Sequence, residues 1–257
     1  RGGEADFVIV ECYGALEPFY TAEHLVYGDD RSPPPESTRI DTMVTVVDAS
    51  RFIRDCNEGK GLSEIDLAME PGDDRTVPEV LVEQVEFADV LVLNKTDLVS
   101  ASELVQVQAL LARLNPRAKI LQAAFGRVPV QEAARTGLFD FDATEDGVGW
   151  LAELDGVFDD VGEVIGVSSF TYFHHRPFHP IRFNELLHDF DLNAVGLIRA
   201  KGFIWIASRH HEIGIWSLAG LASVFTYGGA WLASTPVREW PQDEEERAEI
   251  MKQWVAP

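Results

Sequence analysis

The sequence predicts an α/β protein: a doubly wound, mostly parallel sheet followed by a smaller α+β domain. Up to about Gly137, short apolar runs alternate with stretches of helical spacing, which is typical of a parallel sheet with crossover helices. In the second half, short runs rich in Trp and Phe surround one or two helices, which is typical of an α+β domain. An acidic stretch separates these parts, so we expect a first domain at 1–138, a linker at 139–165 and a second domain at 166–257.

Apolar runs and helical spacing place the expected elements of the first domain. Strands are expected at Asp6–Val10, Thr42–Val47, Val90–Leu93 and Lys119–Ala124. Helices are expected after Pro18 and at Val77–Phe87, Glu103–Leu114 and Val130–Arg135. The mixed, acidic stretch Cys56–Arg75 is interpreted as a flexible or partner-facing insertion.

The second domain is expected to hold four strands and a central helix. The strands are expected at Val167–Phe173, Gly196–Ala207, Ile213–Leu218 and Ala222–Tyr227. The amphipathic helix is expected at Pro180–Phe190, and the acidic tail Gln242–Glu249 is expected to be helical.

Composition narrows the class of partner. Asp and Glu number 43 against 21 Lys and Arg, a net charge of −22, so the chain should repel nucleic acid. No apolar run approaches the about 18–20 residues of a membrane span, so no membrane partner is expected. The two cysteines, Cys12 and Cys56, form no CxxC pair, which indicates a reducing compartment, and we expect a cytoplasmic protein.

The motif Asn94-Lys95-Thr96-Asp97 directly follows an apolar run. Ligands of parallel sheets bind beyond the carboxyl ends of the strands, where these residues would emerge. The Asp97 carboxylate can accept two hydrogen bonds from the edge of guanine, whereas adenine would leave it poorly paired. The Lys95 stem can lie along the base, and the Asn94 amide can tie this loop to a neighbouring one, with Ala124–Gly126 near the far side of the base. The alternative is an Asx-type turn in which Asp97 caps a helix.

A second candidate site follows the first expected strand. Glu11 could hold Mg²⁺, directly or through water, or orient a nucleophilic water. Gly14, three residues later, would let the backbone approach a γ-phosphate. Taken alone the signal is weak, because a strand that ends in Glu is common.

The phosphate-binding loop of nucleoside triphosphatases is not found in the sequence. Such a loop reads GxxxxGK[ST], and the nearest stretch, Gly59-Lys60-Gly61, has neither the spacing nor the hydroxyl. Either the chain is a fragment without an N-terminal βα unit, or the protein has lost triphosphate binding. The order of elements favours the fragment, since such a fold needs a strand and a loop before Glu11. An α/β hydrolase is disfavoured because no GxSxG element occurs.

Together these motifs resemble the CobW-like zinc-handling P-loop GTPases, often described as metallochaperones, with their C-terminal domain. The resemblance is carried by Glu11–Pro18, Asp41–Asp48, Glu83–Leu98, Arg176–Phe183 and Arg199–Ala207, of which Glu83–Leu98 (EQVEFADVLVLNKTDL) is the most specific. Family members also carry a P-loop and a Cys-x-Cys-Cys metal motif before the Glu11 element and usually continue past Trp254. By this resemblance we expect a P-loop GTPase fold truncated at both ends.

The resemblance implies a parent protein that binds GTP, hydrolyses its phosphoanhydride and couples GTP state to zinc transfer to a zinc-dependent client protein. Asn94, Lys95 and Asp97 would bind the guanine, and Glu11 and Gly14 would be the catalytic residues on the Mg²⁺ and γ-phosphate side. GTP, Mg²⁺ and Zn²⁺ are implied, with both metal sites mostly in the missing N-terminal part, so this chain alone should hydrolyse GTP weakly or not at all. The alternative is a degenerate, non-enzymatic module that binds a protein or a metal, and a homo-oligomer is left open.

Six of the seven histidines fall between His174 and His211. The adjacent pairs His174/His175 and His210/His211 are candidate zinc ligands, because neutral imidazole binds zinc and each pair on a strand could offer one ligand to a site. The alternative is surface or hydrogen-bonded histidine, since no two of them show the i, i+4 spacing of a helical zinc motif.

Overall fold

The computed structural model describes residues 7–28, 39–141, 170–188, 197–220, 222–243 and 247. Contacts between Cα atoms divide the chain into two units, residues 1–169 and 170–257. The expected linker lies almost wholly outside the described residues. Within the described ranges, no helix is long and apolar enough to cross a membrane.

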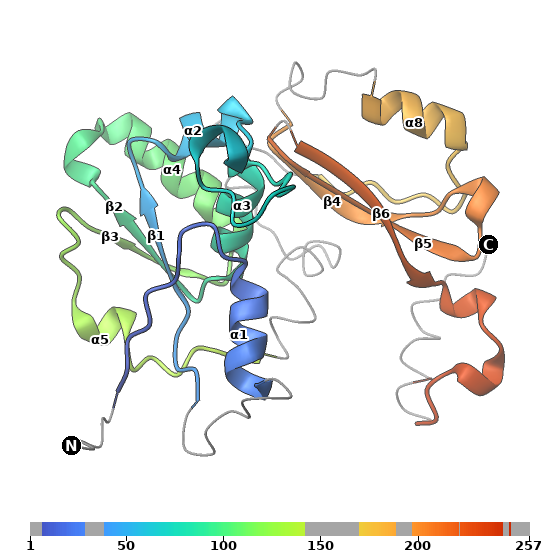
Figure 1. Ribbon diagram of the computed structural model, residues 1–257, viewed down its shortest axis with the longest axis horizontal. Coiled ribbons are helices and arrows are strands. Elements are labelled where there is room, and N and C mark those ends of the chain that lie inside the picture. The colour runs from blue at the N-terminus through green and yellow to red at the C-terminus, as the bar shows by residue number, and fades with distance from the viewer. Residues whose placement is uncertain are drawn as a thin grey trace. The chain divides into compact units, whose positions relative to one another are not determined.

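The first unit is built on a parallel sheet with the strand order β1–β2–β3 (Figure 1). The strands are β1 (Val44–Asp48), β2 (Val90–Asn94) and β3 (Lys119–Gln122). In the central strand, Val90 to Leu93 are each at most 4% exposed, as expected for a parallel strand covered on both faces. The register pairs Asp48 with Asn94, so these two residues leave the sheet side by side.

Helices connect and flank the strands of this sheet. They are α1 (Pro18–Tyr27), α2 (Phe52–Glu58), α3 (Val77–Phe87), α4 (Ala101–Leu114) and α5 (Val130–Ala133), with 3-10 turns at Leu62–Ile65 and Thr96–Leu98. Capping boxes begin α3 and α4, because the side chains of Thr76 and Ser100 each accept a hydrogen bond from the backbone three residues on. Both crossovers run in the same direction along the sheet, so right-handed connections place α3 and α4 on one face.

Asn115, which ends α4, is buried and joins three elements. Its amide donates to the carbonyl oxygens of Val85, Glu86 and Ala88 at 2.8, 3.0 and 2.8 Å, just where α3 ends. Its side-chain oxygen accepts the backbone N–H groups of residues 117 and 118, which lead into β3. Asn115 therefore holds α3, α4 and β3 together.

The second unit is an antiparallel sheet with the order β4–β5–β6 and one helix packed on it (Figure 1). Its elements are α8 (Pro180–His188), β4 (Arg199–Ile204), β5 (Glu212–Ala219) and β6 (Ala222–Ala230), with 3-10 turns at Ala207–Arg209, Leu232–Ser234 and Val237–Glu239. Phe183 of α8 packs with Ile204 and Ile206 in a core whose rim includes Trp216 and Phe225. The α/β class of the first unit and the separate, smaller α+β unit are as the sequence predicts, and the structure adds that the second sheet is antiparallel.

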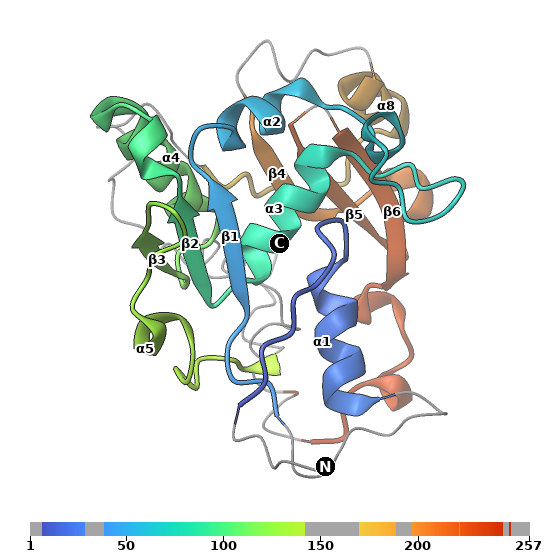
Figure 2. The same cartoon turned by 60° about the vertical axis from the view of Figure 1, so that its left-hand side comes forward.

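The strand expected at Asp6–Val10 is wrong, and the described end of the strand expected at Val167–Phe173 is not a strand. Residues 7–13 run as an extended segment without strand pairing (Figure 2), and Val8, Ile9 and Val10 are 67, 82 and 61% exposed. A strand needs a neighbour to complete its backbone hydrogen bonds, and no strand in the described part of the chain pairs with this segment. Residues 170–173 are likewise not a strand, and the rest of that expected strand lies outside the described residues, as does most of the expected tail helix.

Candidate nucleotide-binding site

Asn94, the last residue of β2, links two loops at the carboxyl edge of the sheet. Its side-chain oxygen accepts the backbone N–H of Gly126 at 2.9 Å. Next to it, the backbone N–H and the hydroxyl of Thr96 both donate to the carbonyl oxygen of Ala123, at 3.1 and 3.0 Å. The bond from Asn94 is the link to a neighbouring loop that the sequence predicts, and it fixes the loop after β2 against the loop after β3.

Lys95 adopts the left-handed conformation, with φ 60° and ψ 35°, which turns the chain sharply after β2. Its ammonium lies 2.7 Å from a carboxylate oxygen of Asp48, at the end of β1. The other Asp48 oxygen accepts the backbone N–H and the hydroxyl of Ser50, at 2.9 and 2.6 Å. Burial disfavours the charged form of Asp48, but the hydrogen bonds from Lys95 and Ser50 outweigh it, and the pKa of Asp48 lies below its usual value.

Asp97 lies in the 3-10 turn Thr96–Leu98 and is exposed. The residue that caps α4 is Ser100, whose side chain accepts the N–H of Glu103, so the alternative in which Asp97 is a helix cap is not what the structure shows. Within the described part of the chain, the Asp97 carboxylate has no hydrogen-bond partner. It therefore remains free to accept hydrogen bonds from a ligand.

The loop after β3 presents an aromatic side chain beside this turn. Phe125 and Gly126 both have positive φ values, 55° and 67°, and the Phe125 side chain is 79% exposed. For a bulky residue this backbone conformation is unusual, and such strain is often found at ligand-binding loops. The sequence indicates the stretch Ala124–Gly126 but not the role of the phenylalanine ring, because nothing local predicts its backbone conformation.

Glu11 and Gly14 are both exposed, and Glu11 has no hydrogen-bond partner among the residues that the structure describes. A Cβ built on Gly14 would meet no heavy atom within 4 Å, and Gly14 is not among the residues with positive φ. Neither backbone conformation nor packing in this structure therefore requires glycine at position 14. The expected close approach of a ligand remains a reason for glycine there.

Two residues that the sequence analysis did not single out hold the segment after Gly14. The amide of Gln84 in α3 donates to the carbonyl oxygen of Gly14 at 2.8 Å and to that of Leu16 at 3.4 Å. The guanidinium of Arg75 donates to the carbonyl oxygen of Ala15 and to the Glu17 carboxylate, both at 3.1 Å. The only sequence signal for either is the position of Gln84 in the Glu83–Leu98 motif.

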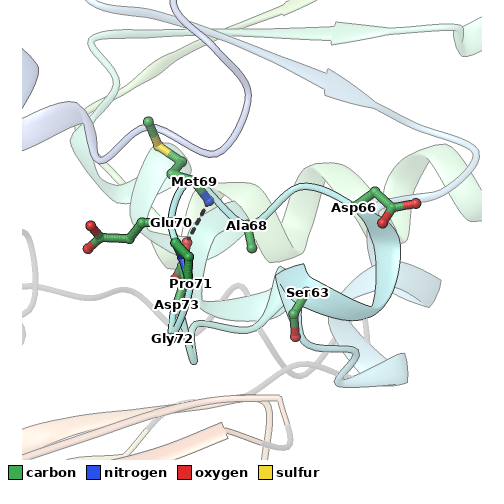
Figure 3. Close-up of a pocket in the computed structure, with 8 residues that line it drawn as sticks. All are labelled: Ser63, Asp66, Ala68, Met69, Glu70, Pro71, Gly72 and Asp73. Carbon is green, nitrogen blue, oxygen red and sulfur yellow. Dashed lines mark hydrogen bonds between the residues drawn. The ribbon is translucent and has the colours of Figure 1, made fainter.

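Residues 59–76 form a loop with a defined base. Backbone hydrogen bonds join Leu62 to Arg75 and Val77 to Lys60, at 2.9 and 2.8 Å, and Leu62 is 2% exposed. Beside them lies an open surface hollow of about 430 Å³ (Figure 3), lined by Ser63, Asp66, Ala68, Met69, Glu70, Pro71, Gly72 and Asp73. These contacts anchor the segment that the sequence presents as a flexible or partner-facing insertion.

The candidate histidines lie in loops and turns rather than on strands, so the expectation that each pair offers ligands from opposite strand faces is wrong. All four are exposed. The ring nitrogen of His174 accepts the N–H of Arg176 at 3.0 Å, and His175 meets the Phe173 ring edge to face. Among the described residues, no group of three or more His, Cys, Asp or Glu side chains could hold a metal ion.

Comparison with known proteins identifies the class. The CobW/HypB/UreG nucleotide-binding domain matches residues 1–122, and the cobalamin synthesis protein cobW C-terminal domain matches residues 167–251. The chain belongs to the CobW family.

Two curated relatives illustrate the similarity. Zinc-regulated GTPase metalloprotein activator 1 of Dictyostelium discoideum is 37% identical over 256 residues, which cover 98% of this chain and 53% of that protein. Zinc chaperone Rv0106 of Mycobacterium tuberculosis is 31% identical over 238 residues, which cover 90% of this chain and 52% of that protein. The chain thus spans about half the length of these relatives.

Among solved structures, the crystal structure of the Zn(II)-bound YjiA GTPase from E. coli matches 86% of this chain and 63% of its own. The identity is 18% and the TM-score is 0.29, a likeness too loose to carry an argument about this site.

Proposed function

We propose that the protein to which these residues belong binds GTP at the carboxyl edge of the β1–β2–β3 sheet and hydrolyses it. The observation that carries the proposal is the exposed Asp97 carboxylate, which has no partner in the described chain. Its neighbours Asn94 and Lys95 are fixed by bonds to Gly126 and Asp48. A fixed turn with one free carboxylate is the arrangement that bidentate recognition of guanine requires.

Each residue of the turn has a distinct task in this proposal. Asp97 accepts two N–H groups of the guanine edge, and the Lys95 stem lies along the base with its ammonium in water. Phe125, exposed beside the Asn94 bond, offers a ring face on which the base can stack. An adenine base presents no matching pair of donors, so it would leave Asp97 desolvated and unpaired.

Glu11 and Gly14 are proposed to act on the phosphate side. Mg²⁺ in phosphate-transfer sites is commonly held by one or two carboxylates together with phosphates and water, and the free, exposed Glu11 carboxylate fits that donor set. When bound, the ion would neutralise charge on the phosphates. Glu11 would hold the ion or orient the attacking water, and Gly14 would leave room for the γ-phosphate.

Zinc is the proposed cargo and a zinc-dependent enzyme the proposed client. The support comes from the relatives, which are named a zinc-regulated GTPase metalloprotein activator and a zinc chaperone. The four candidate histidines remain a hypothesis for contact with the metal. We place the protein in the cytoplasm, in line with its two unpaired cysteines.

The test uses the complete gene product that contains these residues, with GTP and ATP binding measured by calorimetry. Asp97→Asn should lower GTP affinity about ten- to a hundred-fold, because a charged hydrogen bond contributes about 1.5–3 kcal/mol, and should leave ATP binding unchanged. Glu23→Gln on α1 is the matched control, since it also removes one exposed carboxylate, at a position distant in sequence from Asp97. An unchanged guanine preference in Asp97→Asn would remove Asp97 from its role, and absence of any nucleotide binding would favour a non-enzymatic module.

A further inference from the structure

The segment Gly14–Glu17 is held by side chains from two other parts of the first unit. Three consecutive carbonyl oxygens, those of Gly14, Ala15 and Leu16, accept hydrogen bonds from Gln84 or Arg75. The Ala15 side chain is 1% exposed and packs against Leu62 and Val80. A backbone fixed at successive carbonyls has little freedom, so the residues just before it are placed by these contacts.

Arg75 stands between this segment and the loop 59–76. Its Nε and Nη2 atoms donate to the two Asp73 oxygens, both at 2.8 Å, in the paired geometry of a strong arginine–carboxylate contact. Its Nη1 atom reaches Ala15 and Glu17 on the other side. The hydrogen bonds that Arg75 donates to Asp73 raise the pKa of Arg75 and lower the pKa of Asp73, so both groups stay charged throughout the neutral range.

Asp73 also fixes the conformation of the loop 59–76. Its side chain is 5% exposed and also accepts the backbone N–H of Met69 at 3.2 Å, the bond drawn in Figure 3. Thr76, the next residue after Arg75, caps α3, the helix that bears Gln84. The loop 59–76, the start of α3 and the segment Gly14–Glu17 are therefore joined through one guanidinium.

We propose that Arg75 is a positioning residue for GTP hydrolysis: it transmits the conformation of the loop 59–76 to the residues Glu11–Gly14. The inference rests on the proposed function, because Glu11 and Gly14 face the γ-phosphate only in that proposal. Arg75 itself does not touch the reacting atoms. Since the Ala15 carbonyl directly follows Gly14, loss of Arg75 loosens the segment Gly14–Glu17, which contains no residue of the base-binding motif, and leaves Asn94, Lys95 and Asp97 unchanged.

The first measurement is amide hydrogen exchange on the 257-residue chain, followed peptide by peptide. Arg75→Ala should speed exchange in peptides covering 59–76 and at Leu16, whose N–H donates to the Tyr13 carbonyl oxygen in the described chain, and should leave β2 and β3 unchanged. Arg54→Ala is the matched control, because Arg54 also pairs with two carboxylates, Asp55 and Glu58, but within its own helix. Unchanged exchange at 11–17, or faster exchange throughout the sheet, would overturn the inference.

The second measurement is steady-state GTP hydrolysis by the complete gene product. Arg75→Ala should lower kcat about ten- to a hundred-fold, the effect of displacing a reacting group by about 1 Å, while GTP affinity stays within about twofold. Arg75→Lys keeps the charge but not the planar, two-pronged guanidinium, so its kcat should fall between those of wild type and Arg75→Ala. If the alanine variant does not fold, the kcat of Arg75→Lys alone tests the positioning role. Equal kcat in wild type and both variants would refute a positioning role.

The two proposals fail in different ways. If Asp97→Asn leaves guanine preference intact, the proposed function fails. Amide hydrogen exchange at 11–17 would still report whether Arg75 holds the segment Gly14–Glu17. If Asp97 behaves as proposed but Arg75→Ala keeps full kcat, only the positioning role of Arg75 is lost.

Discussion

Asn115 provides the sharpest stability prediction, because one buried side chain makes five hydrogen bonds. Asn115→Ala removes all of them and leaves the carbonyl oxygen of Ala88, a residue that is 4% exposed, without its donor, whereas the Val85 carbonyl keeps the Ala88 N–H at 3.4 Å. Each unsatisfied buried group costs about 1–3 kcal/mol, whereas the N–H groups at 117 and 118 are closer to water. The expected loss is therefore about 2–4 kcal/mol.

The assay is native-state hydrogen exchange of the β2 amides, which reports opening of the first unit alone. Asn57→Ala, an exposed asparagine on α2, is the matched control and should change stability by less than about 0.5 kcal/mol. Asn115→Asp keeps the size of the side chain but replaces the donating amide with a carboxylate, which would face three carbonyl oxygens. This variant should therefore lose as much stability as Asn115→Ala. A loss below about 1 kcal/mol in Asn115→Ala, or a stable Asn115→Asp, would refute the reasoning.

Three further predictions concern other sites. Gly214→Ala should destabilise the second unit by about 1–3 kcal/mol in urea unfolding, because its Cβ would lie 2.7 Å from both the Ile204 carbonyl oxygen and the Phe225 ring. Gly202→Ala is the control and should be tolerated, because its Cβ would meet no heavy atom within 4 Å. Equal losses of stability in the two variants would contradict the packing argument. Maleimide at pH 8 should add once to the native chain, at exposed Cys12, because burial raises the pKa of Cys56 to about 12; two rapid additions would be the contrary result. The folded-state pKa of Asp48 is lowered, so the contribution of its charge to folding stability is present above about pH 4 and is lost on acidification. The difference in unfolding free energy between wild type and Asp48→Asn is at most about 1 kcal/mol for so exposed an ion pair, and it should shrink between pH 7 and pH 3. A difference that stays constant with pH would be inconsistent with the Lys95 contact.

Local sequence predicts the helices and the paired strands well. The helix expected at Val77–Phe87 has those bounds in the structure, because Thr76, Pro78 and Glu79 together mark a helix start. The Asn94 motif is likewise visible, since it consists of adjacent residues at the end of an apolar run. At the start of α3, one stretch of chain contains both partners of the interaction that fixes the structure, Thr76 and Glu79.

Features that depend on distant partners were not predicted. Lys95 meets Asp48 across 47 residues, and Gln84 meets Gly14 across 70, so neither contact leaves a local pattern. The expected strand at Asp6–Val10 fails for the related reason that its apolar residues show a preference for a strand but not a neighbour to pair with. The pair His210/His211 shows the same limit, because its place in a turn follows from where β4 ends and β5 begins.

The Asp48 carboxylate accepts hydrogen bonds from both Ser50 and Lys95, so a change at Lys95 in the base-binding turn also affects Ser50. A ligand that draws the Lys95 ammonium away would leave Asp48 to Ser50 alone, and the charge felt by the Ser50 amide proton would change. That amide lies at the entry to α2, outside the turn itself. Its NMR resonance would therefore follow occupancy from a residue that needs no contact with the ligand.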